Sequence, residues 1–224
     1  MSDQNIREVR LPGAAAFKDA FLESYKESRA KCSDLEWDEI WTRHWNDFML
    51  RRGAATWRPR APDGRPVLAL TAEKLGLAYS DGEPLRMDAV FCAQNNGHPW
   101  FPMVVAIEHE NDPQGFKTEI AKLLSVRCRL KVGITYTADR LDEAKRWNEN
   151  IRRDLAGLFD RAKSVMKENG RTEYLFLAGT EGWQGKKECK WFVLEFFAHD
   201  GLRGKEFELV HDCEQKGNLV AAGC

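Results

Sequence analysis

Apolar side chains recur at helical spacing in three long segments of the chain, and each segment predicts an amphipathic helix. The first segment is Ala14–Ala30 and the second is Leu35–Arg52. Ser33 or Asp34 stands directly before the second segment and is suited to cap it. The third segment, Ala138–Glu168, is the longest of the three. The residues between and after these helices follow a different pattern.

Short apolar runs bounded by turn-forming residues predict strands in those regions. The expected strands are Val67–Thr71, Leu75–Tyr79, Leu85–Phe91, Val104–Ile107, Val132–Tyr136, Tyr174–Ala178, Trp191–Ala198 and Glu206–Val210. A further helix is expected after the turn at Asn111 and Asp112, because Pro113 suits the first turn of a helix. This order of elements predicts a single domain of the mixed α/β or α+β class.

The composition is that of an ordinary globular protein of 224 residues, with 43% hydrophobic and 31% charged positions. A net charge of −1 provides no overall attraction for nucleic acid or membrane, so any phosphate-binding surface must be local. The polar N-terminus lacks the apolar core of a signal peptide, and no apolar run approaches the roughly 20 residues of a membrane span. The six cysteines form no C-x-x-C pair, which argues against structural zinc and is compatible with reduced thiols and a cytoplasmic location.

Isolated carboxylates stand at two neighbouring apolar runs. Asp88 interrupts one run, and Glu108 and Glu110 end the next. Side chains two apart on a strand share a face, so both glutamates point one way and His109 points the other. The 20 positions that separate Asp88 from Glu108 suit adjacent antiparallel strands. Three carboxylates brought together repel one another unless they bind protons or cations, and Mg²⁺ prefers such hard oxygen ligands. We therefore expect a site for Mg²⁺ or Mn²⁺.

This series of elements resembles the core of the PD-(D/E)XK nuclease superfamily, which has the restriction-endonuclease fold. The resemblance covers about residues 35–137 and leaves a C-terminal helix and strands, about 138–224, as an extension of the same domain. In that family an Asp ends one strand and a (D/E)-x-K follows on the next, in a mixed sheet flanked by helices. The resemblance implies that Asp88, Glu108 and Glu110 are catalytic metal ligands.

The chain departs from the family pattern at Glu110, which occupies the position usually held by lysine. A Glu-x-Glu form is known in restriction enzymes of the BamHI type, and it leaves the general base open. Lys122, on the helix that follows, is a candidate, since some members of the family carry the lysine there. Glu119 and Gln114 are additional candidate residues of the metal site at the same face.

An acid on the first core helix is also implied by the family resemblance, and Glu39 is preferred to Glu36 because it lies near the edge of the apolar stripe. Two basic clusters are candidates for phosphate contacts, since arginine forks suit phosphates and tryptophan offers a stacking plane. The first consists of Arg51, Arg52, Trp57, Arg58 and Arg60, with Arg65 nearby; a solvated loop has the same composition. The second consists of Lys117, Lys122, Arg127, Arg129 and Lys131.

Together these features predict a Mg²⁺- or Mn²⁺-dependent endonuclease that hydrolyses phosphodiester bonds in double-stranded DNA and has no membrane association. Nucleases that cut both strands often act as twofold dimers, so a homodimer is expected. One alternative is a catalytically inactive protein of the same fold that binds a protein or nucleic acid, which the missing lysine and the near-neutral charge favour. The plainest alternative makes Glu108 and Glu110 a solvated strand end, with Asp88 paired to Arg86 or a lysine.

Overall fold

The computed structural model describes residues 11–50, 65–81, 86–93, 102–112, 115–137, 141–167, 172–180, 191–197 and 208–211. Strands in these ranges form one seven-stranded sheet: β1 (Leu77–Ser80), β2 (Ala89–Ala93), β3 (Met103–Glu110), β4 (Leu130–Thr137), β5 (Glu173–Thr180), β6 (Trp191–Phe197) and β7 (Glu208–His211). The helices are α1 (Ala14–Ala30), α2 (Asp34–Glu39), the π-helical η1 (Ile40–His44), α3 (Trp45–Met49), α4 (Val67–Lys74), α5 (Phe116–Ser125) and α6 (Leu141–Lys167). None of the helices in these ranges is long and apolar enough to cross a bilayer. The mixed α/β class expected from the sequence is confirmed.

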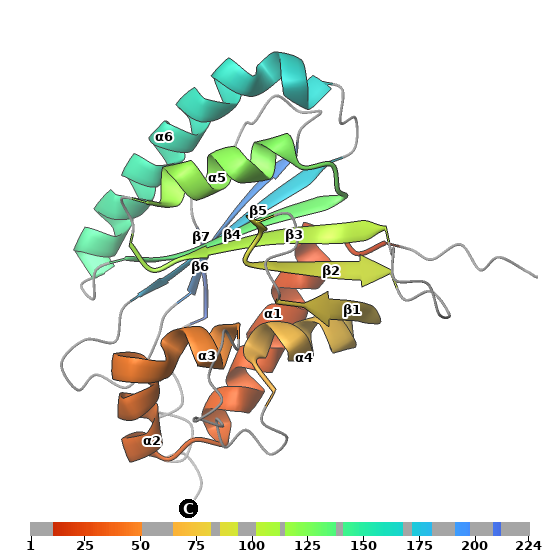
Figure 1. The fold of residues 1–224 in the computed structure, drawn as a ribbon. Coiled ribbons are helices and arrows are strands. Elements are labelled where there is room, and N and C mark those ends of the chain that lie inside the picture. The colour runs from red at the N-terminus through yellow and green to blue at the C-terminus, as the bar shows by residue number, and fades with distance from the viewer. Residues whose placement is uncertain are drawn as a thin grey trace, which may run out of the picture.

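The strands lie in the sheet in the same order as in the chain. β1, β2 and β3 pair antiparallel, β3, β4 and β5 pair parallel, and β5, β6 and β7 pair antiparallel again. Each parallel pair is joined through a helix, α5 or α6, and both helices cover the same face of the sheet (Figure 1). The carboxyl ends of β3, β4 and β5 therefore meet at one edge, which is also where α5 and α6 begin.

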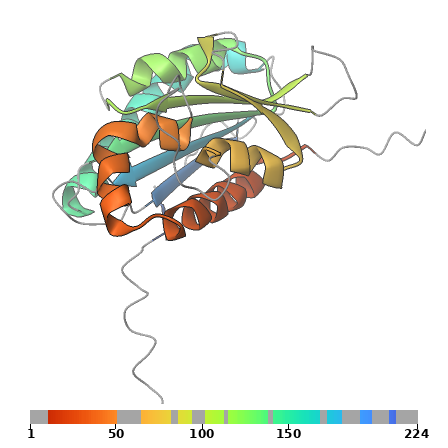
Figure 2. The same cartoon turned by 60° about the horizontal axis from the view of Figure 1, so that its bottom comes forward.

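Helices cover both faces of the sheet, and the sheet separates the core into two clusters. Helices α1 and α4 and the segment from α2 to α3 lie on one face, as Figure 2 shows from below. Aromatic rings join these helices to the sheet: the ring centroids of Tyr25 and Trp191 are 5.4 Å apart, and those of Tyr25 and Trp37 are 6.1 Å apart. Helices α5 and α6 pack on the other face, through residues such as Ile120 and Phe159.

The second helix expected from the sequence is interrupted. It begins as expected at Ser33, which forms a capping box: the N–H of Glu36 donates to the Ser33 hydroxyl, and the N–H of Ser33 donates to the Glu36 carboxylate at 2.9 Å. The π-helical turn η1 then inserts before α3, which ends at Met49. This wider turn lets Trp37 and Trp45 face the same core, with ring centroids 5.9 Å apart.

The expected strand at Val67–Thr71 is wrong, because these residues belong to helix α4. Most of the helix is buried, so no polar face reveals a helical period. A continuous apolar run does not distinguish a buried helix from a buried strand. The hydroxyl of Thr71 donates to the carbonyl of Val67 at 2.8 Å, a bond across one helical turn. Packing against α1 therefore decides the conformation of this segment.

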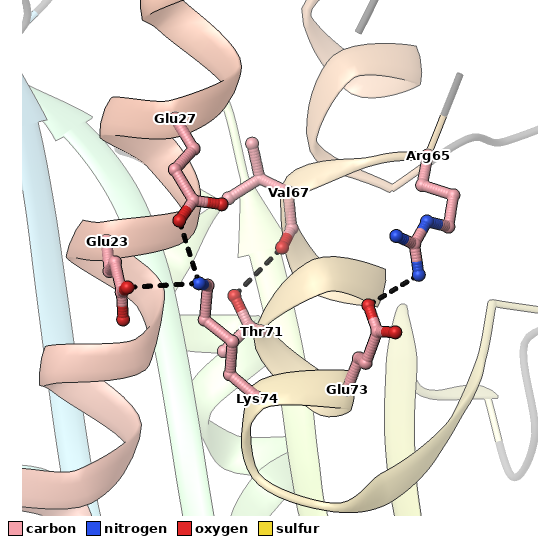
Figure 3. Close-up of polar contacts among 7 residues, drawn as sticks. All are labelled: Glu23, Glu27, Arg65, Val67, Thr71, Glu73 and Lys74. Carbon is pink, nitrogen blue, oxygen red and sulfur yellow. Dashed lines mark hydrogen bonds and ion pairs between the residues drawn. The ribbon is translucent and has the colours of Figure 1, made fainter. Parts of the chain in front are cut away.

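A lysine shared between two carboxylates ties α4 to α1. The ammonium nitrogen of Lys74 lies 3.2 Å from a carboxylate oxygen of Glu23 and 2.9 Å from one of Glu27 (Figure 3). The bond to Glu27 is the first cause of a raised pKa at Lys74, followed in the same direction by the bond to Glu23. Because all three side chains reach solvent, these pairs add little stability and chiefly fix how α4 lies on α1.

Gly13 is the N-cap residue of α1 and has no side chain to cap the helix, so a carboxylate from β5 takes that role. Glu173 accepts a 2.7 Å hydrogen bond from the N–H of Ala14 and another of 2.7 Å from the guanidinium of Arg129. We expect Glu173→Ala to lower the free energy of unfolding by about 1–2 kcal/mol, as for the loss of a helix cap. Urea unfolding measures the change. Glu173→Gln keeps an oxygen for Ala14 and should lose less; equal losses in both variants would contradict a capping role.

Candidate active site

Asp88 and Glu108 lie side by side on neighbouring strands. Asp88 directly precedes β2, and the antiparallel pairing of Ala89 with Ile107 places it opposite Glu108 near the end of β3. The carboxylate of Asp88 is buried and accepts a 2.7 Å hydrogen bond from the N–H of His109. This bond holds the carboxylate against β3, in the adjacent antiparallel arrangement that the spacing of the two acids predicts.

Glu108 is the most unusual side chain of the site. It is 0% exposed, and neither of its carboxyl oxygens makes a hydrogen bond of normal geometry to a residue that the structure describes. Burial first, and then the negative charges of Asp88 and Glu119, raise the pKa of Glu108 from 4.5 to about 9, although Lys122 opposes the rise. The carboxyl group of Glu119 is close enough to interact with that of Glu108, and this interaction also raises the pKa of Glu108. The Glu108 carboxyl therefore keeps a proton at neutral pH unless another positive charge replaces it. A solvated strand end, the plainest alternative for Glu108, is excluded by this burial.

Lys122 reaches the same acids from α5. Its ammonium nitrogen lies 3.7 Å from Oε1 of Glu108 and is bonded to the carboxylate of Glu119, one turn earlier in the helix. The bond to Glu119 is the first cause of a raised pKa at Lys122, so the lysine is charged at neutral pH. Its side chain is 39% exposed. Lys122 is thus a partly exposed cation that pairs with both Glu108 and Glu119.

A glycine allows α5 to approach the sheet at this point. Gly133 on β4 is the partner of Glu108 in the parallel pair. A Cβ at Gly133 would lie 2.6 Å from Cδ1 of Ile120 and 2.9 Å from the ring of Phe116, both on α5. The role of Gly133 was not predicted from the sequence, where its signal is a glycine inside a strand-forming run, which marks a close approach.

Glu110 shares a face of β3 with Glu108, but its carboxylate is turned toward the loop that follows. Its Oε1 accepts a 2.7 Å hydrogen bond from the N–H of Asp112, and a Cβ at Gly115 would lie 2.8 Å from its Oε2. In the described part of the chain, no three His, Cys, Asp or Glu side chains are placed so that they could hold a metal. Glu110 can join Asp88 and Glu108 only if its side chain rotates away from Asp112.

His109 points to the opposite face of the sheet, as the alternation along the strand predicts. Its Nε2 lies 2.7 Å from the hydroxyl of Tyr136. Tyr136 in turn packs edge-on against Trp45, with ring centroids 5.4 Å apart. The histidine ring thus belongs to the core beneath α3, and only its backbone N–H serves the acidic cluster.

The acid proposed for the first core helix lies away from this face. Glu39 is on α2, which covers the other side of the sheet, and its carboxylate is 4.0 Å from a ring nitrogen of His44. Gln114 lies outside the described residues. So does the first basic cluster, which consists of Arg51, Arg52, Trp57, Arg58 and Arg60.

The second basic cluster does not form one surface. Lys117 pairs with Asp154 of α6 at 2.5 Å, and Arg129 is bonded to Glu173. Lys131 is fully buried under α5, where its ammonium lies 5.1 Å from the centre of the Tyr174 ring. Burial lowers the pKa of Lys131 to about 8. Lys122 is the member of this cluster that contacts Glu108.

Comparison with known proteins adds little to this geometry. No family model matches the chain, and no curated protein matches it. Among solved structures, the crystal structure of the central domain of yeast acetyl-CoA carboxylase is similar over 80% of this chain, with a TM-score of 0.35 and 10% identity. The chain spans 33% of the length of that protein. A likeness of this degree supports no inference about fold or function.

Proposed function

We propose that the chain is a divalent-metal-dependent nuclease of the PD-(D/E)XK type that hydrolyses phosphodiester bonds in DNA. The observation that carries the proposal is Glu108, a completely buried carboxyl group that makes no hydrogen bond of normal geometry to a described residue, next to the buried Asp88. Such an arrangement costs folding free energy, and ionisable groups with strongly shifted pKa values cluster at functional sites. The succession of Asp88, a Glu-x-Glu strand, a helix and a parallel strand is the one that the family resemblance implies.

The donor groups suit a hard divalent cation. Asp88, Glu108 and, after rotation, Glu110 would hold Mg²⁺ or Mn²⁺ through carboxylate oxygens. A cation there would replace the proton that burial otherwise keeps on Glu108. When bound, such an ion activates a water molecule and stabilises the negative charge that develops on a phosphate under attack.

The chain's own residues would divide the remaining work. Lys122 stays protonated, since its bond to Glu119 raises its pKa, and it can therefore donate to a phosphate oxygen but not accept a proton. Acceptance of the water proton is then left to a carboxylate. Glu110 is the partly exposed acid of the set and stands where the family usually has lysine, so we assign this role to Glu110.

Cleavage of plasmid DNA and RNA tests the proposal, with Mg²⁺, Mn²⁺, Ca²⁺ or EDTA present. We expect cleavage of DNA with Mg²⁺ or Mn²⁺, and a loss of at least about 100-fold in Asp88→Ala and Glu108→Ala, since these residues would hold the ion itself. Glu73→Ala is the matched control, because this carboxylate is exposed on α4 and contacts Arg65. Sedimentation of the same samples measures the proposed homodimer.

Absence of cleavage with every divalent cation would contradict the proposal, as would full activity in both variants. A chain that binds DNA or a protein partner without any cleavage would support the inactive relative of the same fold. The present position of Glu110, bonded to Asp112, is the observation that favours this second function.

A further inference from the structure

A second buried polar group on this face of the sheet makes no hydrogen bond to any residue that the structure describes. Thr135 lies on β4 in register with Glu110 on β3, so both side chains emerge on the face that α5 covers. The side chain of Thr135 is 0% exposed, and its hydroxyl has no hydrogen-bond partner among the described residues. A buried hydroxyl without a partner costs folding free energy, and in a native protein it calls for an explanation.

Other buried threonines of the protein are satisfied. The hydroxyl of Thr71 donates to the carbonyl of Val67 at 2.8 Å, and the hydroxyl of Thr172 donates to the carbonyl of Cys128 at 3.2 Å. Among the buried residues that the structure describes, Ser24 and Ser28 of α1 also have hydroxyls without a hydrogen-bond partner, but they lie on the opposite face of the sheet. Thr135 is the buried threonine of the sheet whose hydroxyl lacks one.

The position of Thr135 connects it with the acidic cluster. Glu108 pairs with Gly133, which has no side chain, so Thr135 is the next side chain along β4 on this face. Paired residues on adjacent strands are about 5 Å apart. On its other side, Thr135 pairs with Ala178 of β5, which is apolar. Across both strand pairs, Glu110 is thus the polar side chain nearest in register to the hydroxyl.

We propose that Thr135 is a positioning residue of the metal site and that its hydroxyl donates a hydrogen bond to the carboxylate of Glu110 when that carboxylate holds the cation. This inference rests on the proposed function. To join Asp88 and Glu108, Glu110 has to release the N–H of Asp112. A carboxylate in a buried setting needs another donor in exchange, and metal-binding carboxylates are held by such a second hydrogen bond. Thr135 supplies it from the adjacent strand.

Three single variants test this role: Thr135→Val, which keeps the shape and removes the hydroxyl, Thr135→Ser, which keeps the hydroxyl, and Thr71→Val as the matched control. Calorimetric titration with Mn²⁺ measures the affinity, and thermal unfolding in EDTA measures stability. We expect Thr135→Val to weaken Mn²⁺ binding about 10-fold and to raise the melting temperature, because an unpaired buried hydroxyl is lost. Thr135→Ser should bind Mn²⁺ as the wild type does. Thr71→Val should unfold at a lower temperature and keep its affinity.

Unchanged Mn²⁺ affinity in Thr135→Val would overturn the inference and leave the proposed function standing. A lower melting temperature together with weak binding in both Thr135 variants would also overturn it, because it would show a structural role. Wild-type protein that binds no Mn²⁺ would overturn the proposed function itself, and this inference with it. Thr135→Ala, which also lacks the hydroxyl, serves as the second variant if valine perturbs the fold.

Discussion

Replacing Glu108 by glutamine is expected to make the metal-free protein more stable at pH 8 than the wild type. Burial raises the pKa of the Glu108 carboxyl from 4.5 to about 9. The stability associated with the protonated carboxyl is therefore fully present below pH 4.5 and is lost as the pH rises through 9. Glutamine has the same shape and no charge to bury. Because one pKa unit corresponds to about 1.4 kcal/mol, we expect a gain of a few kcal/mol, to order of magnitude.

Urea unfolding in EDTA, repeated from about pH 5 to about pH 9, measures this effect. The free energy of unfolding of the wild type should fall across this range, and that of Glu108→Gln should stay more nearly constant. Glu73→Gln, on the exposed side of α4, is the control. At pH 8, Mn²⁺ should raise the free energy of unfolding of the wild type and leave that of Glu108→Gln unchanged, because the carboxylate binds the ion and the amide does not. Equal pH dependence in all three proteins would show that Glu108 is not buried as a neutral acid.

Replacing Gly133 by alanine is expected to lower the free energy of unfolding by about 1–3 kcal/mol, as for other overpacked cores. The new methyl group would lie 2.6 Å from Cδ1 of Ile120 and 2.9 Å from the rings of Phe116 and Phe176. These side chains are buried in the core, and Ile120 and Phe116 belong to α5, so we expect the methyl group to push α5 away from the sheet. Lys122 would move with the helix, and we expect cation-dependent activity to fall together with stability.

Gly157→Ala provides the comparison for this variant. Gly157 lies inside α6, and a Cβ there would meet nothing closer than 3.7 Å, at the side chain of Arg161. The same chemical change should therefore stabilise the protein by up to about 1 kcal/mol through helix propensity. Thermal unfolding of both variants shows whether they move in opposite directions. Gly133→Ala with wild-type stability would mean that α5 does not pack as closely as described.

Strong local patterns predicted much of the fold. The helix Ala14–Ala30 has the bounds expected from its apolar spacing. Strands β3 to β6 were each recognised to within a few residues, because apolar runs there are bounded by turn-forming residues. The pattern was insufficient at Val67–Thr71, where a helix buried on most sides has the same apolar run as a strand. It also gave no sign of the π-helical turn, which inserts between two tryptophans that pack in the same core.

The candidate site was predictable only as far as neighbouring strands determine it. Alternation along β3 separated Glu108 from His109, and the 20 positions between Asp88 and Glu108 suited the adjacent antiparallel strands that place them side by side. The direction of the Glu110 carboxylate was not predictable, because it depends on a backbone N–H in the next loop. Gly133 and Thr135 were also missed, since their roles depend on what α5 and β3 place against them.

The match between sheet order and chain order bears on how the protein assembles during translation. Strands β1 to β4 and helix α5 form one continuous stretch, residues 77–137, that includes Asp88, Glu108 and Lys122. Each new strand pairs with the strand that emerged from the ribosome just before it, so no strand has to insert between two strands that are already paired. The acids can therefore come together while β5 is still being synthesised, and until then the nascent chain presents the open edge of β4 to the cell.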